Sequence, residues 1–334
     1  MSASRENPIY TTYIISGTTK YNITSAVENL GFSDPEKQMA QILTIEMANP
    51  KVGGTRLSKL LQVRDRVYVY ANDGEKQDEV FRGYIWTRPA KDQLSGSQLT
   101  LKCYDNLIYF QESDDAEFFS SGKTTKAICS ALCEKWGVQL DYTYTSITHA
   151  KMALRGTLSD IFQSDILDLV KNQTGKKYVM RSEKDVVKVK PVGSNSTVYT
   201  IKVKGNAEGI SDECTMDGVV TKVVILGKAD DDDRQPVEAT VSGNTAQYGT
   251  LQKIVNLDSN TSLADAKKEA QSRIDAEGKP KWTYATKSPD IPWIRKGDKV
   301  KVEGEDWNKY FIVLDIDRDI SNKAKTMTLT MEDV

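Results

Sequence analysis

The sequence predicts an α+β, mainly β protein in which two similar small β-barrel domains enclose an intervening α+β domain. Two observations carry this prediction. Apolar residues alternate with a period of two through most of the chain, as strands with one buried face require. Two distant segments, residues 60–105 and 292–333, also share the spacing of these residues, which is typical of duplicated structural units.

The domain organisation follows from where the periodicity changes along the chain. With 334 residues, 39% of them apolar, the chain can form two or three domains with ordinary cores. We predict a first β-barrel over residues 1–110 and an α+β insert of two helices and a hairpin over 111–197. A second β-barrel is predicted over 198–334, interrupted by an inserted helix at about 262–277.

The first block is predicted to be β because residues 9–15, 20–24 and 39–47 alternate, and NPKVGGTRLSKL then supplies turn-forming residues before the first repeat. The two repeats align with an offset of 233 positions in their first strand and of 230 in the following strands. The aligned pairs, which are the candidates for the structural repeat and its interfaces, are Asp65 with Asp298, Val67 with Val300, Val69 with Val302, Phe81 with Phe311, Tyr84 with Leu314, and Trp86 with Ile316.

The middle block changes to helical periodicity, and a glycine ends each of its two helices. A hairpin follows, with strands YVMRS and VVKVK about the turn EKD. After residue 198 the strands return as VYTIKVK, VVTKVVILG and EATVSG, and the helix SLADAKKEAQSRIDAEG precedes the second repeat. The predicted apolar faces are Ala127, Ile128, Ala131, Leu132 and Trp136 in the first helix, and Ile161, Phe162, Ile166, Leu169 and Val170 in the second.

Composition excludes several classes of protein. No stretch approaches the roughly 18–20 apolar residues of a membrane helix, and the N-terminus lacks the pattern of a secretion signal. A net charge of −2 argues against specific nucleic-acid binding. Cys129 and Cys133 lie four apart on a predicted helix, where apolar packing is the usual role, so we expect thiols of a reducing cytosol. The single histidine, His149, has no catalytic motif around it and is predicted to be an ordinary surface residue.

Three segments imitate ligand-binding motifs. Gly122-Lys123-Thr124 imitates the end of a phosphate loop, but Glu117 stands at the position of the first glycine, so Thr124 or Thr125 is predicted to cap a helix instead. Alternating aspartates imitate a calcium loop without its glycine and glutamate, so a strand with a wet acidic face is predicted there. An acidic run is predicted to be a solvated loop. No cofactor or metal is therefore expected; the aspartates concerned are Asp315, Asp317 and Asp319 in the strand, and Asp230 to Asp233 in the loop.

An ordered set of motifs carries a family resemblance over most of the chain. These are L-x-x-x-D-R-V-Y-V with F-R-G-Y-I, then LVKNQTGKKYVMRSEKDVVKVK, QYGTLQKIVN, A-x-x-x-A-x-x-R-I and K-G-D-K-V-K-V. Together they resemble the XkdQ-like tail hub proteins of contractile phage tails, which are similar to the hub domain of type VI secretion spikes. The resemblance implies a non-enzymatic homotrimer that is assembled in the bacterial cytoplasm and becomes part of a phage tail or tail-like particle.

The resemblance also implies the partners: tail tube protein, central spike protein, tape measure protein and baseplate wedge proteins. Two barrels per chain would give the trimer a pseudo-hexameric ring that adapts the hexameric tube to the trimeric spike. Two other functions stay open at the level of sequence. One is a tail-tip peptidoglycan hydrolase with paired carboxylates. The other is a carbohydrate-binding barrel in which Trp282, Trp293 and Trp307 stack on sugars.

Overall fold

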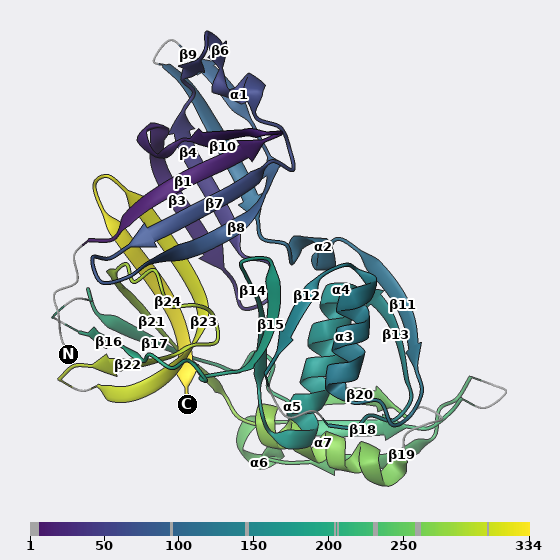
Figure 1. Ribbon diagram of the computed structural model, residues 1–334. Helices are drawn as coiled ribbons and strands as arrows, with labels where there is room; N and C mark the ends of the chain where they lie inside the picture. The colour runs from purple at the N-terminus through teal and green to yellow at the C-terminus, as the bar shows by residue number, and fades with distance from the viewer. Residues whose placement is uncertain are drawn as a thin grey trace.

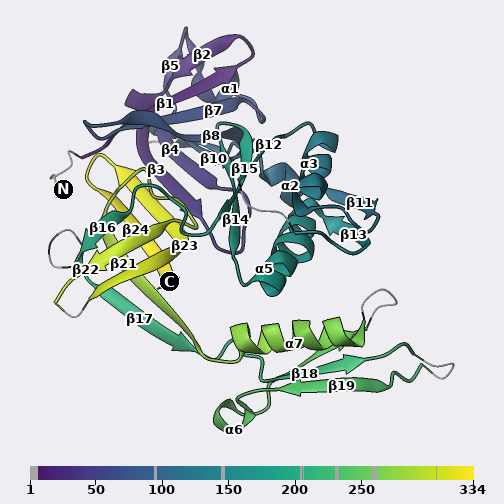
Figure 2. The ribbon, with the colours of Figure 1, turned by 60° about the horizontal axis from the view of Figure 1, so that its bottom comes forward.

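The computed structural model describes residues 7–93, 96–143, 147–203, 205, 207–229, 233–257, 262–305 and 307–334. It confirms the predicted fold class, because strands dominate and two barrels are joined to a unit of helices and short sheets (Figure 1). The two barrels lie side by side and share one continuous fourteen-stranded sheet. A second view separates the helical unit from a smaller α/β unit that extends away from the second barrel (Figure 2).

The first barrel encloses a core of aliphatic and aromatic side chains that point inward from alternate positions of its strands. The short elements η1 (Thr24–Ala26), β5 (Lys51–Val52), β6 (Thr55–Arg56) and α1 (Leu57–Leu60) connect these strands. Its strands are β1 (Ile9–Ser16), β2 (Thr19–Asn22), β3 (Val27–Asp34), β4 (Ile42–Ala48), β7 (Arg66–Asn72), β8 (Gln77–Thr87), β9 (Ala90–Gln93) and β10 (Gly96–Tyr104).

The second barrel has its own core and repeats the strand order of the first. Its strands are β16 (Tyr199–Lys202), β17 (Ile210–Thr215), β21 (Lys281–Pro289), β22 (Lys299–Glu303), β23 (Asn308–Ser321) and β24 (Lys325–Asp333). The neighbours run β16-β22-β23-β24-β21-β17, as β1-β7-β8-β10-β4-β3 do in the first barrel. One pair differs, since β16 is parallel to β22 whereas β1 is antiparallel to β7.

The turn before the first repeated strand is the same in both barrels. The Asp65 carboxylate accepts a hydrogen bond from the Gln62 N–H at 2.7 Å, and the Asp298 carboxylate accepts one from the Arg295 N–H at 3.0 Å. The residue before each aspartate is left-handed, with φ of 69° at Arg64 and 82° at Gly297. The offset of 233 therefore holds in the backbone as well as in the apolar pattern.

The offset of the following strands differs from the sequence alignment. Val67 pairs with Gly83 in the first barrel, whereas its equivalent Val300 pairs with Phe311 in the second. Phe311 is thus equivalent to Gly83 rather than to Phe81, and the offset is 228 instead of 230. The alignment was wrong by two residues because such a shift leaves every side chain on the same face of the strand.

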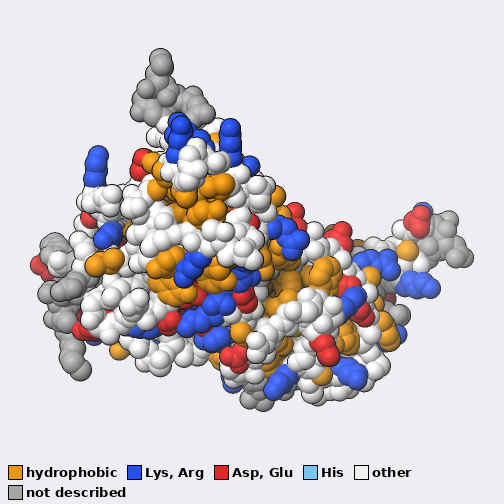
Figure 3. Space-filling model, turned by 45° about the horizontal axis from the view of Figure 1, so that its top comes forward, with side chains coloured by type: hydrophobic (Ala, Val, Ile, Leu, Met, Phe, Trp, Pro, Cys, Tyr) orange, Lys and Arg blue, Asp and Glu red, His pale blue; other side chains and the backbone are white. Residues whose placement is uncertain are grey.

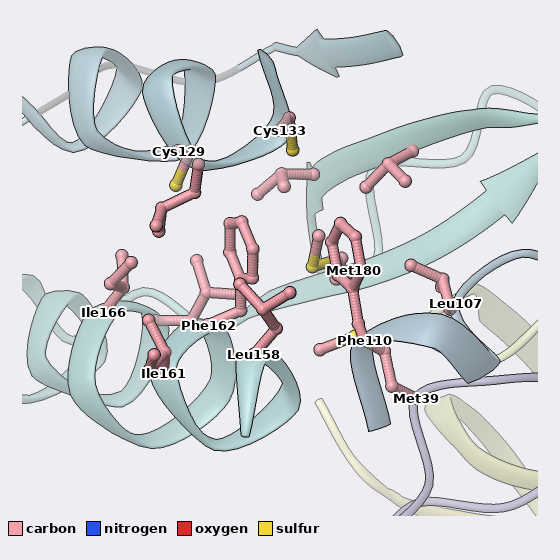
Figure 4. Close-up of a cluster of buried hydrophobic side chains, with 14 of the residues drawn as sticks. Met39, Leu107, Phe110, Cys129, Cys133, Leu158, Ile161, Phe162, Ile166 and Met180 are labelled. Carbon is pink, nitrogen blue, oxygen red and sulfur yellow. The ribbon is translucent and has the colours of Figure 1, made fainter. Parts of the chain in front are cut away.

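The middle unit packs its helices over two small sheets, and Figure 4 shows the cluster of side chains that they bury. Phe110 and Phe162 stack with ring centroids 5.4 Å apart, and Met39 reaches into the cluster from the loop between β3 and β4. The elements are α2 (Ile108–Gln111), β11 (Asp114–Phe119), α3 (Thr125–Lys135), β12 (Gln139–Tyr142), β13 (Met152–Thr157), α4 (Leu158–Asp160), the π-helix η2 (Ile161–Asp168), α5 (Leu169–Thr174), β14 (Tyr178–Glu183) and β15 (Val186–Pro191).

The buried face of α3 differs in part from the prediction. Ile128 and Leu132 are buried as predicted, but Cys129 and Cys133 complete the face and both Ala127 and Ala131 are exposed. The apolar face of the second helix is correct, with Leu169 half-buried at its margin. The cysteines therefore fill the core as small apolar side chains, which agrees with the predicted role.

The segment inserted into the second barrel is larger than the predicted helix. Two segments predicted as barrel strands instead form a separate sheet with a third strand, and a helix covers one face of that sheet. The elements of this unit are β18 (Lys222–Leu226), β19 (Val237–Ser242), α6 (Thr245–Tyr248), β20 (Gln252–Asn256) and α7 (Leu263–Glu277), the last close to the predicted bounds.

Candidate assembly site at the junction of the two barrels

The two barrels are joined by a direct strand pair. Residues Ile316 to Ser321 of β23 pair antiparallel with Asp34 to Asn29 of β3. The same half of β23 also pairs with β24, so it is hydrogen-bonded on both edges. Backbone pairing of this kind fixes the relative orientation of the two barrels, because the register is set by six consecutive residue pairs.

Buried ion pairs and hydrogen bonds reinforce the strand pair. Arg318 points inward from β23 and contacts Asp290 at 2.9 Å, and the Tyr10 hydroxyl of β1 also donates a hydrogen bond to Asp290. The Lys296 ammonium lies 3.0 Å from a carboxylate oxygen of Asp34 and donates to the Pro35 carbonyl at 2.8 Å. The Tyr10 and Lys296 contacts link the first barrel, or its β3–β4 loop, to the second barrel, whereas Arg318 and Asp290 both belong to the second barrel.

The carboxylates at the junction have perturbed pKa values. Burial raises the pKa of Asp290 and of Asp105, the latter to about 7, although Asp105 accepts hydrogen bonds from the Gln41 and Leu107 N–H groups. Burial also opposes ionisation of Asp34, but the charges of Lys296, Arg295 and Arg318 together with the Lys296 hydrogen bond outweigh this effect, so the pKa of Asp34 is lowered. The junction thus combines one stabilised carboxylate with two that burial makes harder to ionise.

The hairpin of β14 and β15 connects the middle unit to both barrels. In its first strand, Arg181 contacts Asp298 of the second barrel at 2.9 Å. At its turn, Asp185 contacts Arg66 and Arg82 of the first barrel, and Lys184 contacts Asp78 at 2.7 Å. The hairpin therefore bridges the two barrels beside their direct contact.

A hollow of about 840 Å³ lies between this hairpin and the barrels. Charged side chains of both signs line it, among them Arg82, Glu183, Lys188 and Arg295. Lys and Arg side chains are interspersed with Asp and Glu over the face in Figure 3. This mixture, with a net charge of −2 for the chain, matches a protein contact better than a polyanion.

The predicted repeat residues lie mostly inside the barrels. Val67, Val69 and Phe81 belong to the first core, whereas the second core contains a separate set. Leu314 occupies the bulge of β23 that corresponds to Trp86 in β8. Buried side chains of this kind offer no surface to a neighbouring subunit, so they define the repeat rather than an interface. The set in the second core is Val300, Val302, Phe311 and Ile316.

Three of the four remaining repeat residues make contacts with the middle unit. Tyr84 and Trp86 point out of the first barrel, and the rings of both pack edge-on against Tyr109. Asp298 receives Arg181, as described above, whereas Asp65 caps its turn. These contacts lie within one chain and hold the middle unit against the barrels.

His149 was predicted to be a surface residue, and this prediction was wrong. The side chain is buried, its Nε2 lies 2.7 Å from the Thr125 hydroxyl, and burial lowers its pKa. Its Nδ1 has no hydrogen-bond partner among the described residues. The hydroxyl that His149 contacts belongs to a threonine, and not to a serine or cysteine nucleophile.

The other motif predictions have clear outcomes where the chain is described. Thr124 caps α3, since its hydroxyl accepts the Ala127 N–H at 3.2 Å. The aspartates of β23 belong to a strand, with Asp317 and Asp319 exposed. Asp230 to Asp232 lie outside the described residues. In the described part of the chain, no cluster of three or more potential metal ligands occurs, and no helix is long and apolar enough to cross a membrane.

The buried ion pairs at the junction were not predicted from the sequence. Arg318 offered a signal, because it shares the inward face of β23 with Ile316 and Ile320. A basic residue at such a position requires a buried carboxylate. Nothing in the sequence indicates that Asp290 is that carboxylate.

Comparison with known proteins places this fold. The model of the YQBQ-like family matches residues 31–332. The chain belongs to the YQBQ-like family. No curated protein sequence matches the chain. Solved structures show the same fold at low identity, which confirms at the level of the fold the resemblance to tail hub proteins.

Three of these structures illustrate the likeness. The tail protein from Neisseria meningitidis MC58 is 14% identical, with a TM-score of 0.72 over 97% of this chain and 96% of its own. The 43 kDa tail protein of prophage MuSo2 from Shewanella oneidensis is 12% identical, with a TM-score of 0.68 over 97% and 98%. The E. coli c3393 protein, a type VI secretion component similar to the T4 tail proteins gp27 and gp5, is 8% identical, with a TM-score of 0.58 over 92% and 74%.

Proposed function

We propose that this YQBQ-like protein is the hub of a contractile injection system. Three copies form a ring of six barrels that adapts a hexameric tail tube to a trimeric spike. The supporting observation is the common strand order of the two barrels in one chain, which lets a threefold assembly present six similar units. The likeness to tail proteins and to a type VI secretion component supports the same role.

A ring of this kind requires a fixed angle between the barrels of one chain. The β3–β23 pair, the Tyr10–Asp290 hydrogen bond and the Lys296–Asp34 ion pair supply it, because each would have to break for the barrels to hinge. Contacts between chains would be heterologous, and a ring that closes does not grow further. A permanent assembly of this type needs interfaces on the order of 2,000 Å² or more.

The role of a hub implies particular partners and a particular location. The tail tube protein and the central spike protein bind opposite faces of the ring. The tape measure protein and baseplate wedge proteins contact it within the tail tip. The hub is assembled in the bacterial cytoplasm and then becomes part of a phage tail or tail-like particle.

We propose that the protein has no enzymatic activity and binds no cofactor. Of the tryptophans considered for sugar stacking, Trp282 is 48% exposed, whereas Trp293 donates to Asp73 and Trp307 packs against the second core. For the hydrolase alternative, we expect a cell-wall zymogram with the purified chain to show no clearing. Clearing that is lost when one acidic residue is replaced would support the hydrolase alternative instead.

The ring is tested by light scattering and negative-stain electron microscopy of the purified chain, with and without its spike protein. We expect a trimer whose projections show six lobes around one axis. A stable monomer or dimer in the presence of the spike would contradict the proposed function.

A further inference from the structure

Among the strands that leave an edge open, β9 and β17 lie at opposite parts of the two-barrel body. Within the described part of the chain, β9 pairs only with β10, and β17 pairs only with β21. In Figure 1, β9 lies at the top of the first barrel and β17 in the second barrel at the lower left. An open edge presents unpaired N–H and C=O groups and readily accepts another strand.

The open edge of β9 is equivalent to an edge of β23 that is already occupied. Ala90 pairs with Leu99, and at the offset of 228 their equivalents Arg318 and Met327 also pair with each other. The other edge of β23 at Arg318 pairs with Phe32 of β3. β9 therefore presents the first barrel's version of the surface that binds β3.

The open strand β17 is, in turn, equivalent to β3. Leu30 of β3 pairs with Ile45 of β4, which pairs with Leu101. In the second barrel, Ile210 of β17 pairs with Thr286 of β21, which pairs with Leu329, the residue equivalent to Leu101. The two open edges are thus the two halves of the contact that joins the barrels within one chain.

We propose that β17 of one copy of this chain pairs antiparallel with β9 of the next copy. This inference rests on the proposed ring and specifies its contact between chains. The register of the β3–β23 pair places Arg88 opposite Cys214 of the neighbouring copy, and Ala90 opposite Asp212. Repetition of one contact within and between chains is what a near-sixfold arrangement of three chains requires.

The backbone of this segment permits such a pair. Pro89 lies between β8 and β9, and its carbonyl accepts a hydrogen bond from the Thr100 N–H at 3.1 Å. The backbone groups of Pro89 therefore face β10, and the N–H that proline lacks is not needed at the open edge. Arg88 and Ala90, its neighbours, turn their backbone groups toward the open edge, because these directions alternate along a strand.

The charges of the two edges are complementary. Lys91 is exposed on β9, and Asp212 and Glu213 are exposed on β17. The proposed register places Lys91 diagonal to Glu213 and Arg88 diagonal to Asp212, within reach of long side chains. Lys and Arg side chains also gather at the top of the molecule in Figure 3.

The same charges disfavour the alternative partner of β17. The residue of β23 equivalent to Lys91 is Asp319, which would lie diagonal to Glu213 if β17 paired there. Like charges in this arrangement are destabilising. The acidic strand β17 thus discriminates between the two equivalent edges, as specific pairing requires.

A disulfide with the native Cys214 tests the register. In the variant Arg88→Cys, the two thiols lie opposite each other, a separation that a disulfide spans. We expect most of the oxidised protein to run as linked dimer and trimer on a non-reducing gel. The other cysteines, Cys103, Cys129 and Cys133, are buried. The matched controls are Thr87→Cys, whose side chain faces the other way, and Arg88→Cys with Cys214→Ser; neither should link.

Arg88 donates a hydrogen bond to the Ser58 carbonyl, so Arg88→Cys removes a contact within the chain and could impair folding. A second disulfide pair that retains Arg88 is therefore needed. Ala90→Cys with Asp212→Cys, built on Cys214→Ser, probes the same register and leaves Arg88 intact. A trimer by light scattering without linkage in either design would overturn this contact and leave the proposed ring standing. A monomer without linkage in the presence of the spike protein would overturn both.

Charge reversal tests the discrimination. Lys91→Glu should weaken assembly about fivefold per interface, the upper range for a cross-strand charge pair, and Lys91→Glu with Glu213→Lys should restore it. Lys267→Glu, on the exposed face of α7, is the control and should leave assembly unchanged. Equal weakening by Lys91→Glu and Lys267→Glu would show that only net charge matters and would refute the pairing of charges.

Discussion

Removal of Arg181 should detach the hairpin from the second barrel at a large cost in stability. Its side chain is 10% exposed and donates to the Asp298 carboxylate at 2.9 Å and to the Lys296 carbonyl at 3.2 Å. Although burial disfavours its charge, Asp298 and then Glu183 raise the pKa of Arg181. The guanidinium therefore stays charged, and its loss leaves the buried Asp298 without a cation.

The expected effect of Arg181→Met is a loss of about 3–5 kcal/mol, the range for breaking one partner out of a buried pair. Urea unfolding followed by fluorescence measures it as a lower midpoint of the transition. The matched control is Arg273→Met in α7, where the ion pair with Glu277 is also 2.9 Å long but both side chains are 38% exposed. That change should cost about 0.5 kcal/mol or less.

A double variant separates the unpaired charge from the lost packing. Asp298→Asn keeps an oxygen for the Arg295 N–H but removes the charge that Arg181→Met strands. Glu183 keeps Lys188 at 2.9 Å as a partner in either variant. Arg181→Met with Asp298→Asn should thus recover part of the loss. If Arg181→Met shifts the midpoint no more than Arg273→Met does, the buried pair does not stabilise the junction and the reasoning is refuted.

Three further changes test the fold. Burial raises the pKa of Asp105 to about 7, so the contribution of this group to stability is lost as pH rises from about 4 to 7. Asp105→Asn should therefore flatten the decline of the melting temperature over this pH range. An unchanged decline would contradict the role of Asp105. Gly83→Ala should lower the free energy of unfolding by about 1–3 kcal/mol or prevent folding, because the added Cβ would lie 2.0 Å from the Tyr104 carbonyl oxygen. The control Gly31→Ala, whose Cβ would lie 3.9 Å from its nearest neighbours, should unfold near the native midpoint. Thr124→Ala should lower stability by about 1 kcal/mol in urea unfolding through loss of the α3 cap, and no shift would exclude that role.

Local features of this protein were determined by the sequence itself. Thr124 begins a helix, and Gly175 ends another with φ of 69°. The hairpin turn at Lys184 and Asp185 has the positive φ values that a two-residue connection needs. The duplicated barrels were also predictable, since alternation and spacing record which positions face a core. The helix cap, the helix end and the hairpin turn each depend on interactions between residues close in the chain.

Only the tertiary structure decided the relations between distant segments. The two-residue error in aligning the repeats was invisible to alternation, because an even shift preserves the buried face. From the sequence, β18, β19 and β20 could not be distinguished from barrel strands. Alternation identifies a strand but does not show which other strands it pairs with. The burial of Arg318 and His149 likewise depends on partners far away in the chain, since a polar group is tolerated inside only where the fold places its partner.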